Sequence, residues 1–355
     1  MRILNKISLI KYRCKLLLSV VVYLIFINTN VLKAQDPIFS LFESTAMNFN
    51  PSHVGNEDYS RVAIGYRNQY PTYKSPFVTY MASYDLYIEP AKSGLGLMIM
   101  NDKVGNGAFN TTSVSVAYSY NLQLSSDLRM RGGLSLSYIS RKRDPNGLIF
   151  PDMPYFNGNI AYPAGYPVIS NNTIYVGFGA TLLYKRFKTG AALFNLGGQQ
   201  LSESSVISLP NPVKVTAYMS VDVPLIQRYN KRALKEDVLV MSPYIRYIKQ
   251  YGFDDVDIGA YFDFDMFFVG LAHRSDTGFK NSTFVIGTGL RTKLFNIGYS
   301  ANFGNIGRDS RYFSAHEINV VLKLKNVKGE SMLQGIYRNN EPSYYQRSRS
   351  YKCPY

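Results

Sequence analysis

Apolar and polar residues alternate along most of the chain between residues 60 and 325. In residues 113–122 every second side chain is apolar or aromatic, and the side chains between them are small or polar. Residues 213–223 repeat this pattern, and no helical period of 3.6 fits either stretch. A strand that crosses a bilayer in a closed barrel exposes every second side chain to hydrocarbon. We therefore predict an all-β fold, a transmembrane outer-membrane β-barrel of about 14 antiparallel strands.

The predicted strands are joined by connections that are alternately short and longer. We place the strands at residues 60–69, 75–88, 93–101, 110–123, 128–142, 174–185, 187–195, 213–224, 238–250, 254–265, 266–274, 282–292, 294–303 and 313–325. An even number of strands lets both ends of the chain lie in the periplasm, with tight turns there and longer loops outside. The connection at residues 226–237 is long and charged for a periplasmic turn. We interpret it as a solvated excursion or a periplasmic docking element.

Segments on either side flank the predicted barrel at residues 60–325. Residues 1–34 have the features of a signal peptide, because five basic residues precede an apolar core and Leu32-Lys33-Ala34 suits cleavage before Gln35. A transmembrane anchor fits less well because the core is short. Residues 35–59 are expected to form an N-terminal periplasmic or plug segment, and residues 326–355 a flexible C-terminal tail. We therefore expect export to the outer membrane of a Gram-negative cell through a cleaved signal peptide.

Composition adds three points to this picture. The chain has 30 tyrosines and no tryptophan, so tyrosine is expected to supply the aromatic girdles at the two membrane interfaces. The formal net charge is +15, but loss of residues 1–34 would remove six basic and no acidic residues and lower it to +9. Basicity therefore gives little support to nucleic-acid binding. The mature chain would keep one cysteine, Cys353, which excludes an internal disulfide.

Charged residues on the predicted strands mostly occupy positions opposite the apolar face, and so point into the lumen. They are Arg61, Arg67, Arg129, Arg131, Arg141, Arg246, Arg291, Asp255, Asp257, Asp263 and Asp265. Buried charges are tolerated only where they pair or stay hydrated. One interpretation is a network of salt bridges across the lumen that holds the barrel in shape. The other is a charged lining that selects a permeant solute.

Residue types that carry catalysis are sparse and scattered. His53 precedes the barrel, and the register of His273 and His316 places both with lipid-facing residues near the outer rim. Hydrolysis would require a base beside an acid or a nucleophile, and no such group is evident. Four glycines that could suggest a phosphate loop alternate within strands instead, and are expected to relieve crowding in the lumen or permit bending: Gly94, Gly96, Gly287 and Gly289. We predict no enzyme activity and no catalytic, cofactor-binding or metal-binding residues.

Short motifs spread over the whole predicted barrel resemble one known family. They are Gln35-Asp36-Pro37, Asn50-Pro51-Ser52-His53-Val54-Gly55, Tyr66-Arg67-Asn68-Gln69-Tyr70-Pro71, Ala82-Ser83-Tyr84-Asp85, Gly94-Leu95-Gly96-Leu97, Phe150-Pro151-Asp152, Val269-Gly270-Leu271-Ala272-His273-Arg274, Gly298-Tyr299-Ser300 and His316-Glu317-Ile318. Together they look like the PorP/SprF family of the type IX secretion system in Bacteroidota.

This resemblance implies a non-enzymatic accessory component that supports export or surface attachment of specific cargo, such as large adhesins. In some bacteria the family is linked to gliding motility. The implied partners are the periplasmic ring proteins of the secretion system and a secreted cargo protein, besides outer-membrane lipid. No nucleic acid is expected among them.

Two function classes remain open from the sequence. The first is the secretion accessory, in which the outer loop at residues 143–173, the connection at residues 226–237 or the tail contacts other proteins. The second is an outer-membrane channel or transporter for small or hydrophobic solutes, because barrels of this size can enclose a passage. An occluded lumen with paired charges would favour the accessory, and a wide lumen with a continuous charged lining would favour transport.

Overall fold

The computed structural model describes residues 36–42, 44–57, 59–73, 75–105, 107–144, 155–156, 159–160, 168–200, 211–230, 235–278, 282–304 and 312–325. The predicted signal peptide at residues 1–34 and the predicted tail at residues 326–355 lie outside these residues. Among the described residues, no helix is both long and apolar enough to cross a bilayer.

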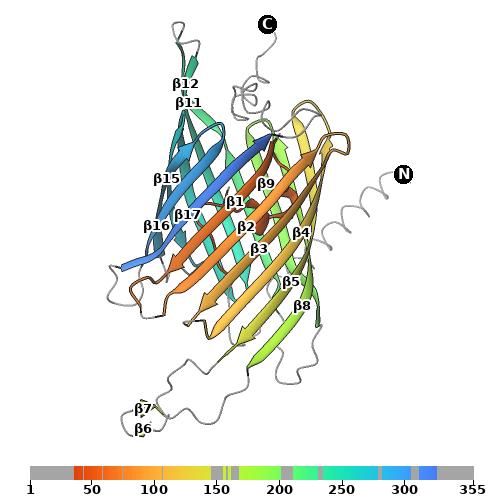
Figure 1. The fold of residues 1–355 in the computed structure, drawn as a ribbon. Coiled ribbons are helices and arrows are strands. Elements are labelled where there is room, and N and C mark those ends of the chain that lie inside the picture. The colour runs from red at the N-terminus through yellow and green to blue at the C-terminus, as the bar shows by residue number, and fades with distance from the viewer. Residues whose placement is uncertain are drawn as a thin grey trace, which may run out of the picture.

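The described strands form a closed antiparallel barrel (Figure 1). They are β1 (Tyr59–Gln69), β2 (Phe77–Ile88), β3 (Ser93–Val104), β4 (Phe109–Gln123), β5 (Leu128–Arg143), β8 (Ile169–Tyr184), β9 (Phe187–Gln200), β10 (Lys214–Val221), β11 (Val223–Asn230), β12 (Lys235–Gln250), β13 (Phe253–Phe264), β14 (Phe267–Ser275), β15 (Ser282–Arg291), β16 (Phe295–Gly304) and β17 (Tyr312–Lys325). Consecutive strands of this series pair, except β10 with β11, and pairing of β1 with β17 closes the ring. Both β10 and β11 pair with β12 and continue one another across Asp222. Counted as one, they give the predicted 14-stranded barrel, which is confirmed.

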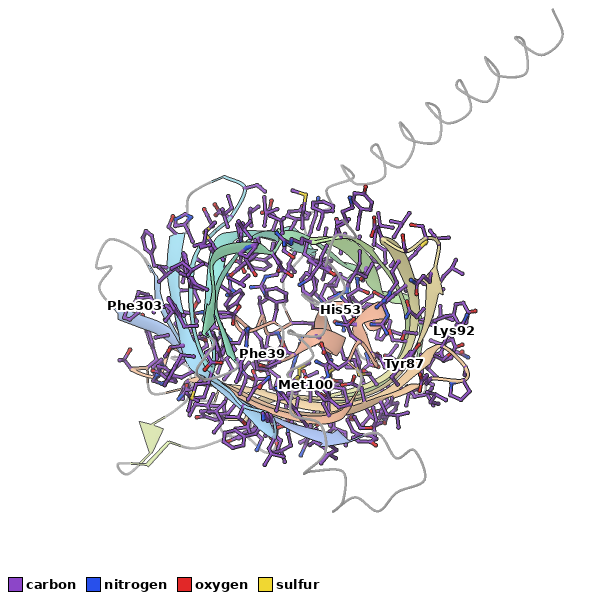
Figure 2. All side chains as sticks on the ribbon, turned by 90° about the horizontal axis from the view of Figure 1, so that it is seen from above. Phe39, His53, Tyr87, Lys92, Met100 and Phe303 are labelled. Atoms are coloured by element: carbon purple, nitrogen blue, oxygen red, sulfur yellow. The ribbon has the colours of Figure 1, made fainter. Side chains whose placement is uncertain are left out.

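Alternation of exposure along the strands follows the alternation in the sequence. In β4, Ser113, Ser115 and Ser119 are buried, whereas Val114 and Tyr118 are exposed on the outer surface. The apolar outer face meets lipid, and the small polar side chains leave room inside the barrel. Figure 2, a view along the barrel, shows Phe39, His53 and Met100 inside the ring and Phe303 outside it.

The connection predicted at residues 226–237 is largely strand, so this part of the prediction is wrong. Pairing of β11 with β12 continues from Val223↔Met241 to Asn230↔Lys235, with a register shift between Pro224 and Ile226. Figure 1 shows the two strands running beyond the neighbouring turns as a projecting hairpin. We interpret this part of the hairpin as lying beyond the membrane. There the apolar alternation ends because no lipid demands it, although backbone pairing goes on.

The outer connections are shorter than the sequence suggested. Strand β8 begins at Ile169 and β9 continues to Gln200, so both extend further outward than predicted. Between β5 and β8 the described residues form a small hairpin of β6 (Tyr155–Phe156) and β7 (Asn159–Ile160). The rest of the predicted outer loop, residues 145–154, 157–158 and 161–167, lies outside the described part of the chain.

The chain before β1 contributes two short helices inside the barrel, α2 (Ala46–Phe49) and the 3-10 helix η1 (Pro51–His53). Asn50 caps η1, because its side chain accepts a hydrogen bond from Ser52 N at 2.9 Å, and Pro51 suits the first helical position. Asn50, Ser52 and Val54 have no exposed surface. The hydrophobic core of this protein therefore lies in the lumen, between the barrel wall and the N-terminal segment.

Candidate functional site: the filled lumen and its periplasmic vestibule

Residues 36–57, called here the lumen segment, are held in the barrel by buried charges on the wall. The first anchor is Glu317 on β17, which is fully buried. Its carboxylate pairs with Arg67 on the adjacent β1 and accepts hydrogen bonds from Ser40 N at 2.9 Å and Leu41 N at 3.4 Å. One carboxylate thus pairs with a buried guanidinium and accepts hydrogen bonds from two backbone N–H groups that have no sheet partner.

The second anchor is a row of three charges on β12, β13 and β14. Asp257 lies between Arg246, with Nε at 2.8 Å, and Arg274, with Nε at 2.7 Å. Arg246 also donates to the carbonyl of Phe39 at 3.0 Å. Because the row carries two positive charges and one negative, the Phe39 carbonyl supplies a further acceptor for its excess of donors.

The third anchor holds the end of the lumen segment that leads into β1. Asp85 on β2 pairs with Arg61 at 2.5 Å and accepts a hydrogen bond from Gly55 N at 2.8 Å. Arg131 donates to Gly55 O at 2.7 Å and to Asn56 Oδ1 at 2.6 Å. Gly55 has a φ of +60°, and a β-carbon there would stand 2.6 Å from the carbonyl of Leu86. Glycine is needed here for both its conformation and its size.

These pairs correct the predicted network across the lumen. Arg61 and Asp85, Arg67 and Glu317, Arg246 and Asp257, and Asp257 and Arg274 are each directly opposite in the register of adjacent strands. They stay on one wall because a 14-stranded barrel is too wide for side chains to meet across it, and the lumen segment occupies the space between.

The other predicted lumenal charges are more peripheral. Arg291 pairs with Asp263 near the periplasmic end, and Arg141 bonds to Asn211 near the outer end. Asp255 is half-buried, and Arg129 and Asp265 are exposed.

Glycines on the wall form a cradle for the lumen segment. A β-carbon at Gly133 would overlap Ser52 N, and one at Gly94 would overlap the carbonyl of Val54. At Gly96 it would lie 2.9 Å from Val54 Cγ1, and at Gly298 it would lie 2.7 Å from Leu41 Cδ1. The strand glycines that the sequence suggested for relief of crowding thus admit a specific partner, the N-terminal segment itself. Gly287 does so through Leu41, and Gly289 accommodates Phe268.

Aromatic side chains fix the lumen segment on the opposite side. Phe42 packs against Tyr244 and Tyr261, with ring centroids 5.5 and 6.1 Å apart, and Phe49 packs edge-on to Tyr218 at 5.8 Å. Arg246 lies 5.3 Å above the Phe42 ring, so the second anchor and this aromatic cluster share a residue.

His53 belongs to the same packing. Its Nε2 lies 2.9 Å from the hydroxyl of Tyr218. His273 contacts Phe284 on the outer face, as its register predicted. Within the described residues, no group of three metal-ligating side chains occurs.

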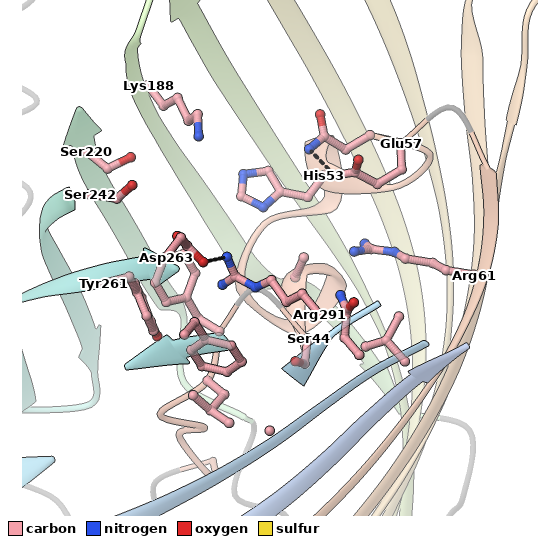
Figure 3. A pocket seen from close by; sticks show the side chains of 18 of the residues that line it. Ser44, His53, Glu57, Arg61, Lys188, Ser220, Ser242, Tyr261, Asp263 and Arg291 are labelled. Atoms are coloured by element: carbon pink, nitrogen blue, oxygen red, sulfur yellow. Dashed lines mark hydrogen bonds and ion pairs between the residues drawn. The ribbon is translucent and has the colours of Figure 1, made fainter. Parts of the chain in front are cut away.

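A cavity of about 250 Å³ remains at the periplasmic end of the lumen, and we call it the periplasmic vestibule. Ser44, Ala46 and His53 of the lumen segment form its inner end, and Figure 3 shows Arg61, Asp263 and Arg291 around it. Lys188 and Asp222 pair at 2.7 Å on its wall. Charges of both signs line the vestibule, so it has no clear preference for an anion or a cation.

Comparison with known proteins decides the family. A sequence model of the "Type IX secretion system membrane protein PorP/SprF" family matches residues 31–322, which includes the lumen segment and nearly the whole barrel. The chain belongs to the PorP/SprF family. It is therefore a membrane component of the type IX secretion system, and its barrel is of the outer-membrane kind. That family and fold are those of a secretion component and not of an enzyme.

The other comparisons add little to this PorP/SprF assignment. A search of the curated proteins found no match. Among solved structures, a "CymD monoaromatic hydrocarbon channel" is 11% identical with a TM-score of 0.48, and covers 80% of this chain and 93% of its own. The Ralstonia pickettii toluene transporter TbuX is 12% identical with a TM-score of 0.46, and covers 79% and 92%. Scores this low carry no argument about function.

Three of the anchoring residues were not recognised from the sequence. Asp85, Arg274 and Glu317 appeared only within family motifs. Alternation along the strand could have identified them, because each of these three residues lies on the same strand face as small or polar residues that point inward.

Replacing the central carboxylate is expected to destabilise this PorP/SprF protein strongly. Glu317→Gln leaves Arg67 buried without a counter-charge, which costs about 3–5 kcal/mol. Asp127→Asn is the matched control, because it breaks an exposed pair with Lys185 and should cost about 0–1 kcal/mol. Urea unfolding in phospholipid vesicles measures both variants. Equal midpoints for the two would contradict the anchor.

Two adjacent glycines provide a second test. Gly133→Ala places a methyl group against Ser52, and such overpacking costs about 1–3 kcal/mol. Gly132→Ala faces outward with no atom within 4 Å and should be neutral. Hydrogen exchange read by mass spectrometry should show faster exchange of residues 44–57 in Gly133→Ala alone. If both variants exchange like the wild type, the cradle has no role.

Proposed function

We propose that this protein is a plugged-barrel accessory of the type IX secretion system that supports export or surface attachment of specific cargo. Large adhesins are the cargo class we expect, with gliding motility as one process they could serve. The observation that carries the proposal is the filled lumen, in which three buried charged anchors hold residues 36–57. A barrel filled in this way would act through its surfaces and not by conducting solutes.

The projecting hairpin of β11 and β12 is the surface we assign to periplasmic partners. It extends past the turns on the same side of the barrel, so it would reach furthest toward a periplasmic ring (Figure 1). Where the hairpin leaves the barrel, Leu225 and Ile226 are 48% and 49% exposed, which gives it apolar contact area. On the other side of the membrane, the connection between β5 and β8 is the surface we assign to cargo.

A channel for small or hydrophobic solutes is the alternative function. The periplasmic vestibule could hold a small molecule, but its inner end is made of the lumen segment. On the outer side of that segment, a cavity near Asp36 has a volume of only about 20 Å³. Passage would therefore require the segment to leave, against its charged anchors and its glycine cradle.

The experiment is quantitative proteomics of the cell surface and culture medium in a strain lacking this protein. The deletion strain is compared with its parent and with strains complemented by the wild type or by a variant in which an Asn-Gly turn replaces residues 226–237. We expect one or a few large secreted proteins to disappear in the deletion strain and to return with the wild type but not with the shortened hairpin.

A matched control replaces residues 125–127, the tight turn between β4 and β5, with Asn-Gly, and should restore export. Heat-modifiable mobility on gels confirms that each variant forms a barrel. An intact secretome in the deletion strain would overturn the accessory role and favour solute transport. Full export by the hairpin variant would overturn only the assignment of the periplasmic surface.

A further inference from the structure

The lumen segment begins at the outer end of the barrel. Its first described residue, Asp36, makes two hydrogen bonds with Gln250: Asp36 N donates to Gln250 Oε1 at 2.9 Å, and Gln250 Nε2 donates to Asp36 Oδ2 at 3.0 Å. Gln250 is the last residue of β12, where the chain turns back on the outer side. Asp36 therefore lies near the outer mouth.

Two basic residues also place Asp36 near the outer mouth. The Asp36 carboxylate lies 3.9 Å from Lys214 Nζ and 4.0 Å from Arg141 Nη2. Lys214 is the first residue of β10, and Arg141 lies two residues before the outer end of β5. Three strands thus hold Asp36 from different directions at the same height.

The other end of the segment lies at the opposite mouth. Glu57 lines the periplasmic vestibule, and the chain enters β1 at Tyr59, which pairs with Lys325. Residues 36–57 therefore extend from the outer mouth to the periplasmic mouth. An even-stranded barrel already has its first strand starting in the periplasm, so the chain before that strand has passed through the lumen.

The cavity beside the start of the segment is too small for a return path. The cavity between residues 36–39 and the wall at Lys214, Thr216 and Arg246 has a volume of about 20 Å³. That is room for about one water molecule, far less than a peptide needs. Phe39 is 3% exposed and the Arg246 side chain beneath it 2%, so the layer below Asp36 is closed by side chains.

We infer that the N-terminus of the mature protein, which the predicted cleavage before Gln35 puts next to Asp36, lies at the outer mouth and is displayed on the cell surface. A signal peptide held at the inner membrane would lie on the wrong side for this path, so its removal must precede threading. If the export role proposed above holds, the N-terminus stands on the same side as the cargo loops, but the topology itself does not depend on that role.

The test is cysteine labelling of intact cells with a membrane-impermeant maleimide. A Gly-Ser-Cys-Ser-Gly insert between Gln35 and Asp36 is built into a Cys14→Ser, Cys353→Ser background, and Gln35→Cys serves as a smaller second variant. Tyr73→Cys, in the exposed outer turn after β1, is the surface control. Ser126→Cys, in the exposed turn between β4 and β5, is the periplasmic control.

The N-terminal cysteine should label in intact cells as fully as Tyr73→Cys, whereas Ser126→Cys should label only after the outer membrane is permeabilised. Heat-modifiable mobility confirms assembly of each variant. Labelling only after permeabilisation, or only after denaturation, would overturn the inference. Either result would leave the secretome experiment unaffected, so failure of the topology and failure of the proposed function are distinguishable.

Discussion

Charge inside a closed barrel must be paired, and in this protein the pairing involves two parts of the chain that are far apart in sequence. Arg61, Arg67, Arg246 and Arg274 each pair with a carboxylate on the neighbouring strand, and backbone groups of the N-terminal segment bond to members of all three anchors. The segment has no sheet partners of its own, so these charges also satisfy its N–H and carbonyl groups. Removing either part would leave the other with buried, unsatisfied polar groups.

Shape reinforces this electrostatic dependence. The barrel wall has glycines at positions 94, 96 and 133, where η1 and Val54 contact it. It has large aromatic side chains at Tyr244 and Tyr261, which pack against Phe42. Because the lumen segment fits the barrel wall so closely, it is a structural part of the barrel. The working surfaces that we propose are the two ends of the barrel: the projecting hairpin on the periplasmic side, and the outer loops with the N-terminus on the other.

Membrane physics made most of the barrel predictable from the sequence. The alternation in residues 113–122 had to be a strand because lipid demands an apolar side chain at every second position. The same logic failed for β11 and β12 beyond Val223 and Met241, since no lipid enforces the pattern there.

The lumenal site was less accessible to sequence reasoning. Strand parity predicted that Arg61, Arg246 and Asp257 face inward, but their partners depend on register between strands, which an error of two residues destroys. The path of residues 36–57 was out of reach, because contacts such as Ser40 to Glu317 span 277 residues and follow from shape rather than from any local pattern.

The central claim, that the protein's own N-terminal segment closes its barrel, is tested most directly by conductance in planar lipid bilayers. Purified wild-type protein is compared with a variant lacking residues 37–57, after both have been shown to form heat-modifiable barrels. The account predicts no steady ionic current from the wild type and the sustained current of an open 14-stranded barrel from the variant. An equal, sustained current from both would show that the lumen is already open and would contradict the account.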